Sequence, residues 1–280
     1  MWRRGAAPYP PALLNLPSPP EVLYAVGDAA VLDRQVVAII GARQASPTSV
    51  TFARRIARAL ARAGACVVSG LAVGVDAAAH EGALEAGRGR TCAILGGGID
   101  GGAPAANRTL RERIAMDGLL LSEWGTGVHP DRWMFPHRNR LIAALAKATI
   151  VVQAGPKSGA LHTVRTAIEL DRTIGVVPGP VDTEAFRGSN AFLRAPGACA
   201  IVEPEDALML LSPRTEVTPP PPEYTADEAS VWDALANGAA DIDTITLRAH
   251  LTTVRCLAAV TSLELAGAIE CAVTGEIRRR

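Results

Sequence analysis

The segment FPHRNRLIAAL, residues 135–145, places several hydrogen-bond donors beside an apolar run with helical spacing. Arg138, Asn139 and Arg140 supply these donors, and donors gathered where a helix starts suit an anion. Pro136 disfavours a helical conformation for the residue before it, so we expect the helix to begin after that position. The two arginines should point in different directions, one reaching the carboxyl edge of the sheet and the other serving structure.

A second set of donors stands in the turn GARQASPT. Gly41 ends an apolar run, Arg43 lies in the turn, and Ser46 precedes Pro47 where a helix cap is expected. Backbone N–H groups at a helix start, together with a guanidinium, can bind a phosphate. A well-capped helix with an exposed arginine explains this turn equally well.

Three other turns add weaker candidates. In GPKSG a further helix starts at Lys157, Ser158 and Gly159, but the GxxxxGK[ST] spacing of an ATP-binding loop is absent. Glycines without a Cβ let a backbone approach a ligand closely. On that ground we add the small residues of SGLAVGVD and GGGID, namely Ser69, Gly70, Gly96 and Gly97.

The sequence gives little indication of a metal site or of a catalytic site. Asp76 and His80 have i, i+4 spacing, but a third ligand is missing, and a helix cap beside a histidine on the helix face is the better interpretation. Ser122 and Glu123 belong to no Ser/His/Asp or paired-carboxylate arrangement, and Glu123 should accept a hydrogen bond from an arginine. We expect no metal, no cofactor and no enzyme.

The elements that position these turns are short apolar runs alternating with helical patterns. Continuous Val- and Ile-rich runs of this kind predict parallel strands covered on both faces. The carboxyl ends of such strands meet at one edge, where doubly wound sheets bind ligands. The expected strands lie within residues 36–41, 65–70, 91–97, 118–124, 148–155 and 173–179. We therefore predict an α/β protein with a doubly wound, mainly parallel sheet.

The chain divides into four segments at this level. Residues 1–34 are proline-rich and should form an irregular lead-in that packs on the domain, and residues 35–211 should form the α/β domain. Residues 212–226 should be a stiff proline-rich linker. Residues 227–280 suggest three helices and a hairpin turning at Thr274 and Gly275, the order of a small winged helix-turn-helix domain.

Composition and charge limit the classes of ligand and the cellular compartment to be expected. Lys plus Arg equals Asp plus Glu, at 28 each, but residues 225–280 hold five basic and eight acidic side chains, so the excess positive charge lies in the large domain. Groove binders neutralise phosphates with basic residues, so the acidic small domain makes duplex binding less expected. The five cysteines form no CxxC pair, which fits buried thiols in a reducing cytoplasm. No apolar run is long enough for a membrane span.

From about residue 9 to residue 208 the chain resembles the DNA-processing protein A (DprA/Smf) family. The resemblance rests on motifs in the family's order: VAIIGARQAS, VVSGLAVGVDAAAHEGAL, ILGGGID, LLSEW, FPHRNRLIAAL, SGALHT, VVPGP and RGSN. Val73 stands where the family usually has an arginine, Ala103 replaces a tyrosine, and Gln153 replaces a glutamate.

The resemblance implies an extended Rossmann-like fold that binds single-stranded DNA, forms a homodimer and loads the RecA recombinase during natural transformation, protecting the incoming DNA. It makes Arg43 and the FPHRNR segment the DNA-contacting elements. Two alternatives stay open. One is a nucleotide-processing hydrolase of the Rossmann-like N-ribohydrolase type, and the other is an interaction module with vestigial DNA binding.

Overall fold

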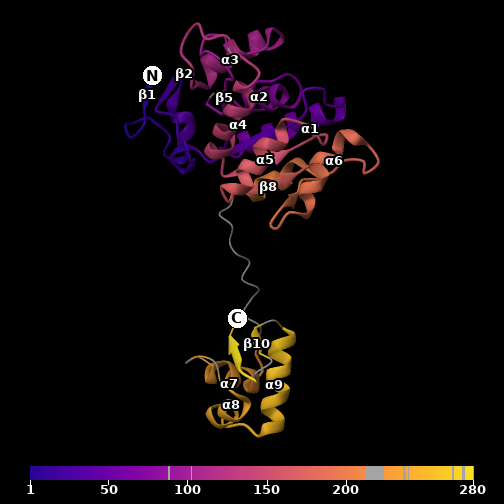
Figure 1. The fold of residues 1–280 in the computed structure, drawn as a ribbon. Helices are drawn as coiled ribbons and strands as arrows, with labels where there is room; N and C mark the ends of the chain where they lie inside the picture. Colours follow the sequence, from indigo (N-terminus) through magenta and orange to yellow (C-terminus); the bar gives the residue numbers. More distant parts are fainter. Residues whose placement is uncertain are drawn as a thin grey trace. The chain divides into compact units, whose positions relative to one another are not determined.

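The computed structural model describes residues 1–87, 89–101, 103–211, 224–235, 238, 240–266, 268–272 and 275–279. The chain forms two compact units, Met1–Pro213 and Arg214–Arg280 (Figure 1). Residues 212–223 of the expected linker lie outside the described residues, and Ala226 at its end already begins a helix.

The described part of the first unit is built on a nine-stranded sheet of order β1-β2-β6-β5-β4-β3-β7-β8-β9. All neighbours from β6 to β9 in that order pair in parallel, which confirms the predicted sheet. The strands are β1 (Trp2–Arg3), β2 (Val22–Gly27), β3 (Val36–Ile40), β4 (Cys66–Ser69), β5 (Thr91–Ile94), β6 (Leu119–Ser122), β7 (Ala148–Val151), β8 (Thr173–Val176) and β9 (Cys199–Ala200).

Helices cover both faces of this sheet. One face packs against α1, α2 and α3, whereas α4, α5 and part of the N-terminal segment pack on the other. Every residue of β3 is buried, as a continuous apolar strand between two helical layers requires. The helices of this unit are α1 (Pro47–Arg62), α2 (Val75–Leu84), α3 (Arg108–Asp117), α4 (Met134–Leu145), α5 (Ala160–Glu169) and α6 (Glu184–Asn190), with 3-10 turns at Pro11–Asn15, Ala29–Asp33, Ala105–Asn107, Ala191–Arg194 and Pro204–Leu210.

The N-terminal segment differs from the expectation of an irregular lead-in. β2 pairs antiparallel with β6, in register from Tyr24 opposite Ser122 to Gly27 opposite Leu119, and β1 pairs with β2. Leu13 and Leu23 are fully buried in the core of the first unit. The prolines therefore interrupt this segment without keeping it off the sheet.

The strand order reverses between β3 and β7. From β3 the chain adds β4, β5 and β6 on one side, and then crosses back to place β7, β8 and β9 on the other. Doubly wound sheets bind ligands at such a reversal, outside the carboxyl ends of the strands. The turns after β3 and β7 are therefore the first places to look for a site.

The second unit has the predicted order of three helices and a hairpin. The helices are α7 (Ala226–Ala234), α8 (Ile242–Ala249) and α9 (Thr253–Leu265), followed by β10 (Ile269–Cys271) paired antiparallel with β11 (Ile277–Arg279). Val231, Ile245, Cys256 and Leu263 lie at the centre of its own core. Gly275 has a φ of +86°, as the expected turn requires, while Thr274 lies outside the described residues.

Candidate functional site

A cleft of about 900 Å³ opens at the carboxyl edge of the sheet, where the strand order reverses. Its walls come from the turn after β3, the first turns of α4, the loop between β7 and α5, and the start of α6. Seven of the predicted site residues line it: Gly41, Arg43, Arg138, Asn139, Lys157, Ser158 and Gly159. The other six, Ser46, Ser69, Gly70, Gly96, Gly97 and Arg140, do not.

Three exposed cations line the cleft. Arg43 and Lys157 were expected there, and Arg132 joins them from the segment just before α4. Glu184 also lines the cleft, and it is an exposed side chain of negative charge. The Arg43 guanidinium lies 5.2 Å from the centre of the Phe135 ring, so a cation–π contact orients it at the wall.

Sequence reasoning missed Arg132 as a site residue, and it included Phe135 only as part of the FPHRNR segment implied by the family resemblance. Their spacing to Asn139, at i, i+3 and i+7, is that of one helical face, and it was the available signal. This spacing was overlooked because the helix was expected to begin after Pro136, whereas α4 begins at Met134. Pro136 is tolerated because it falls in the first helical turn, where backbone N–H groups have no helical partner.

Arg138 reaches the carboxyl edge as expected, but it ends among backbone carbonyls. Only 3% of the residue is exposed. Its Nη1 donates to the Gly70 carbonyl at 2.6 Å and also to the Ile94 carbonyl. Burial lowers the pKa of Arg138 to about 10, against the opposing charge of Asp76. Arg138 therefore ties the ends of β4 and β5 to α4 from the floor of the cleft.

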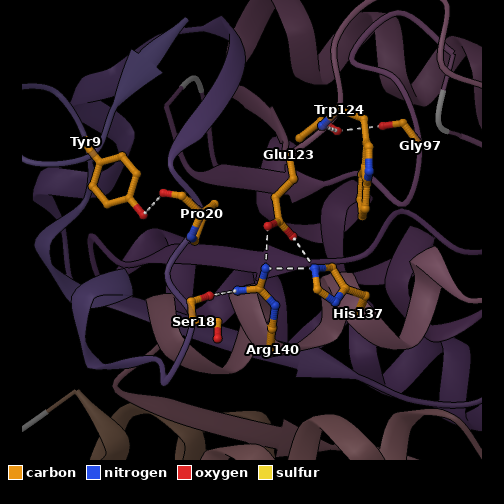
Figure 2. Close-up of polar contacts among 9 residues, drawn as sticks. Tyr9, Ser18, Pro20, Gly97, Glu123, Trp124, His137 and Arg140 are labelled. Carbon is orange, nitrogen blue, oxygen red and sulfur yellow. Dashed lines mark hydrogen bonds and ion pairs between the residues drawn. The ribbon is translucent and has the colours of Figure 1, made fainter.

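Arg140 points away from the cleft, which confirms that the two arginines diverge. Figure 2 shows its guanidinium beside the Glu123 carboxylate, with the Ser18 carbonyl accepting from Nη1 at 2.9 Å. His137 Nε2 lies 2.9 Å from Arg140 Nη2 and 3.5 Å from Glu123 Oε2. Glu123 therefore accepts from an arginine, as predicted, and this network fastens the N-terminal segment to α4.

The expected helix cap at Ser46 is confirmed. The backbone N–H groups of this turn that could have bound an anion donate instead to side chains of the protein. Ser46 Oγ accepts from the Ser49 N–H at 3.1 Å, while the Ser46 N–H donates to Gln153 Oε1 at 2.9 Å. Gln153 is 3% exposed, so it joins the end of β7 to the start of α1. These groups hold the turn that presents Arg43.

The glycine-rich turns make room for the protein's own side chains. A Cβ on Gly70 would collide with the Arg138 guanidinium, one on Gly96 with the Phe135 ring, and one on Gly97 with Pro130. Ser69 is fully buried, and its Oγ donates to the Ile39 carbonyl at 2.6 Å. These residues position the site from below.

Asp76 and His80 each contact groups of the protein itself. Asp76 is not the expected helix cap, because the N-cap of α2 is Gly74; Asp76 lies in the first turn, and its Oδ2 accepts from the Gly70 N–H at 3.2 Å. Burial raises the pKa of Asp76. His80 Nδ1 lies 2.7 Å from Thr91 Oγ1. Across the described residues, no three His, Cys, Asp or Glu side chains are grouped to hold a metal ion, and no described helix is long and apolar enough to cross a bilayer.

Comparison with known proteins agrees with this architecture. Residues 1–212 match the model of the family described as DNA recombination-mediator protein A, and residues 215–272 match a DprA winged helix domain. These matches define a Rossmann-like α/β protein with a C-terminal winged helix. The chain belongs to the DprA/Smf family of DNA processing proteins.

Individual relatives cover most of the chain. A putative DNA processing protein DprA of Mycobacterium tuberculosis is 38% identical over 262 residues, which span 90% of this chain and 67% of the relative. The crystal structure of DprA from Streptococcus pneumoniae superposes with a TM-score of 0.70 at 33% identity, covering 74% of this chain and 72% of that one.

A third comparison concerns nucleic acid. The DprA structure from Helicobacter pylori, described for its unique single-stranded DNA binding mode, superposes with a TM-score of 0.66 at 36% identity. The superposition covers 72% of this chain and 92% of that chain.

Proposed function

We propose that this protein binds single-stranded DNA in the cleft at the carboxyl edge of its sheet. The observation that carries the proposal is the set of exposed cations, Arg43, Arg132 and Lys157, around one cleft at the strand-order reversal. Further support comes from membership of a family with a relative described as binding single-stranded DNA. The DNA backbone, which carries one negative charge per nucleotide, is the part of the ligand that these cations would contact.

Binding of this kind should be sensitive to salt and tolerant of sequence. Phosphate contacts position a strand without reading its bases. For single strands, the logarithm of the affinity falls against the logarithm of salt by about 0.7 per phosphate neutralised. Each cleft cation that contacts a phosphate therefore contributes about 0.7 to the slope.

The test is fluorescence anisotropy of labelled oligothymidylate at several salt concentrations. Arg43→Ala and Lys157→Ala should each weaken binding and lower the salt slope by about 0.7. Arg62→Ala is the matched control, because Arg62 is exposed at the last turn of α1, at the end of the helix remote from Arg43. Full affinity in both cleft variants, or an equal loss in the control, contradicts the cleft as the binding site.

We further propose that the protein acts without catalysing a reaction, protecting incoming DNA and passing it to the RecA recombinase as a homodimer. Family membership supports this part of the proposal. The cysteines are all free thiols, which fits the proposed cytoplasmic location.

Two measurements test these partners. Light scattering at micromolar concentration should give twice the chain mass of 29.1 kDa. Pull-down with RecA should retain the recombinase, and addition of the protein should speed assembly of RecA on single-stranded DNA already coated by a single-strand binding protein. A monomeric mass, or unchanged assembly, contradicts the corresponding part.

A further inference from the structure

Three rings gather beside the start of α4 in a chain whose aromatic content is only 4%. The ring centres of Trp124 and Trp133 lie 6.1 Å apart, and those of Trp133 and His137 lie 5.9 Å apart. The interplanar angles are 83° and 67°, so neither neighbour is stacked flat on Trp133. Trp133 nevertheless remains 55% exposed, which is unusual for a large aromatic side chain.

The cluster is held in place from below. Trp124 follows the end of β6, and its backbone N–H donates to Ser122 Oγ at 3.0 Å. His137 is anchored by Arg140, which is itself paired with the largely buried Glu123 (Figure 2). The two neighbours of Trp133 are therefore fixed by the sheet and by an ion pair. An indole braced in this way loses little conformational freedom when a ligand covers it.

The position of the cluster relates it to the cleft. Trp133 and His137 lie one helical turn apart on one side of α4, whereas Arg132, Phe135 and Asn139 line the cleft. A helix with its side chains is about 10–12 Å across, so the cluster and the cleft are separated by roughly one helix width. A strand leaving the cleft across the first turn of α4 would pass Trp133.

We propose that Trp133, braced by Trp124 and His137, is a stacking site for a nucleobase of the single strand whose phosphates occupy the cleft. The proposal rests on the proposed function and adds a base-binding element to it. An indole can stack on any base, because every base has a π face, so the site keeps the binding tolerant of sequence. Arg132, next to Trp133 in the chain, supplies a cation for the intervening phosphate.

The test compares the full chain with Trp133→Ala and Trp133→Phe by anisotropy of labelled oligothymidylate. Stacking on an aromatic side chain accounts for about fivefold to 150-fold in affinity per base, so Trp133→Ala should weaken binding at least about fivefold. Trp133→Phe retains a ring and should recover most of the loss. Since Trp133 makes no side-chain capping bond, its removal leaves the start of α4 intact.

Two features separate stacking from a general disturbance. The salt slope of Trp133→Ala should equal that of the wild type, because the lost contact involves no phosphate, whereas Arg43→Ala lowers the slope. The affinity difference between wild type and Trp133→Ala should vanish on an oligonucleotide made of abasic sites. Met116→Ala is the matched control, because Met116 is 73% exposed on the last turn of α3, before β6 begins, whereas Trp124 follows the end of β6.

A direct readout uses Trp133 itself. The double variant Trp2→Phe, Trp232→Phe keeps both tryptophans of the cluster, Trp124 and Trp133, and removes the other two of the chain. Oligothymidylate should quench its emission. Unquenched emission, or an affinity of Trp133→Ala within about twofold of the wild type while Arg43→Ala is weakened, overturns the stacking site and leaves the cleft assignment standing. If the wild type binds no oligothymidylate, both proposals fail.

Discussion

Replacing Arg138 should damage the fold before it damages any ligand contact. The side chain is buried, and its guanidinium serves the carbonyls of Gly70 and Ile94. Arg138→Met removes these donors and leaves the Asp76 carboxylate buried without its nearby positive charge. Breaking a buried charge pair by removing one partner costs about 3–5 kcal/mol. In a unit of this size, each kcal/mol lowers the Tm by about 2–4 °C.

The assay is urea and thermal unfolding of the first unit. In a Trp232→Phe background, the remaining tryptophans, Trp2, Trp124 and Trp133, all belong to that unit, so their emission follows its unfolding. Arg138→Met should lower the Tm by about 6–20 °C. Arg43→Met is the matched control, because Arg43 is exposed and its replacement should change stability by less than about 0.5 kcal/mol.

A double variant tests the stated cause. If an uncompensated Asp76 carries part of the cost, then Arg138→Met combined with Asp76→Leu should be more stable than the sum of the two single effects predicts. This structural role of Arg138 is refuted if Arg138→Met unfolds within about 1 kcal/mol of the wild type and lowers the salt slope of DNA binding as Arg43→Ala does. Arg138 would then contact phosphate directly.

Two further predictions concern stability. His80 is buried and its pKa is lowered to about 3, chiefly by burial, so the unfolded chain takes up a proton below about pH 6.5 that the folded chain refuses. The free energy of unfolding of the first unit should fall by about 1.4 kcal/mol per pH unit as the pH falls from there toward 3. Urea midpoints measured at several pH values should show that His80→Leu lacks this pH dependence. A Cβ on Gly82 would collide with the Arg54 carbonyl where α2 meets α1, so Gly82→Ala should cost about 1–3 kcal/mol by calorimetry. Gly101→Ala, where a Cβ meets nothing, should be neutral, and an equal Tm in the two glycine variants would count against this packing argument.

The sheet could be predicted because its central strands are apolar on both faces. Runs such as VVAII carry their own signal, since a strand between two helical layers has no solvent side to alternate with. β2 lacks that signal, because its burial varies from residue to residue and a proline-rich stretch precedes it. β9 is only two residues long. Both join the sheet through pairing with distant residues, which no local pattern reveals.

The residue types of the site could be predicted from the sequence, but the directions in which their side chains point could not. Residue types placed Arg43 and Lys157 at the edge where the cleft lies. Whether Arg138 faces the ligand or the sheet depends on Gly70, 68 positions earlier, whose missing Cβ makes room for the guanidinium. A relation between two residues so far apart in the sequence becomes visible only in the folded chain.

The pairing of β2 with β6 limits how this protein can be shortened. β6 is buried throughout, and β2 covers its outer hydrogen-bonding edge. A fragment starting at residue 35 would uncover that edge and present Leu119, Leu120 and Leu121 to other molecules. Exposed apolar edges recruit strands from neighbouring chains. Such a fragment would self-associate through this edge, and an apparent oligomer seen with it would misreport the assembly of the intact chain.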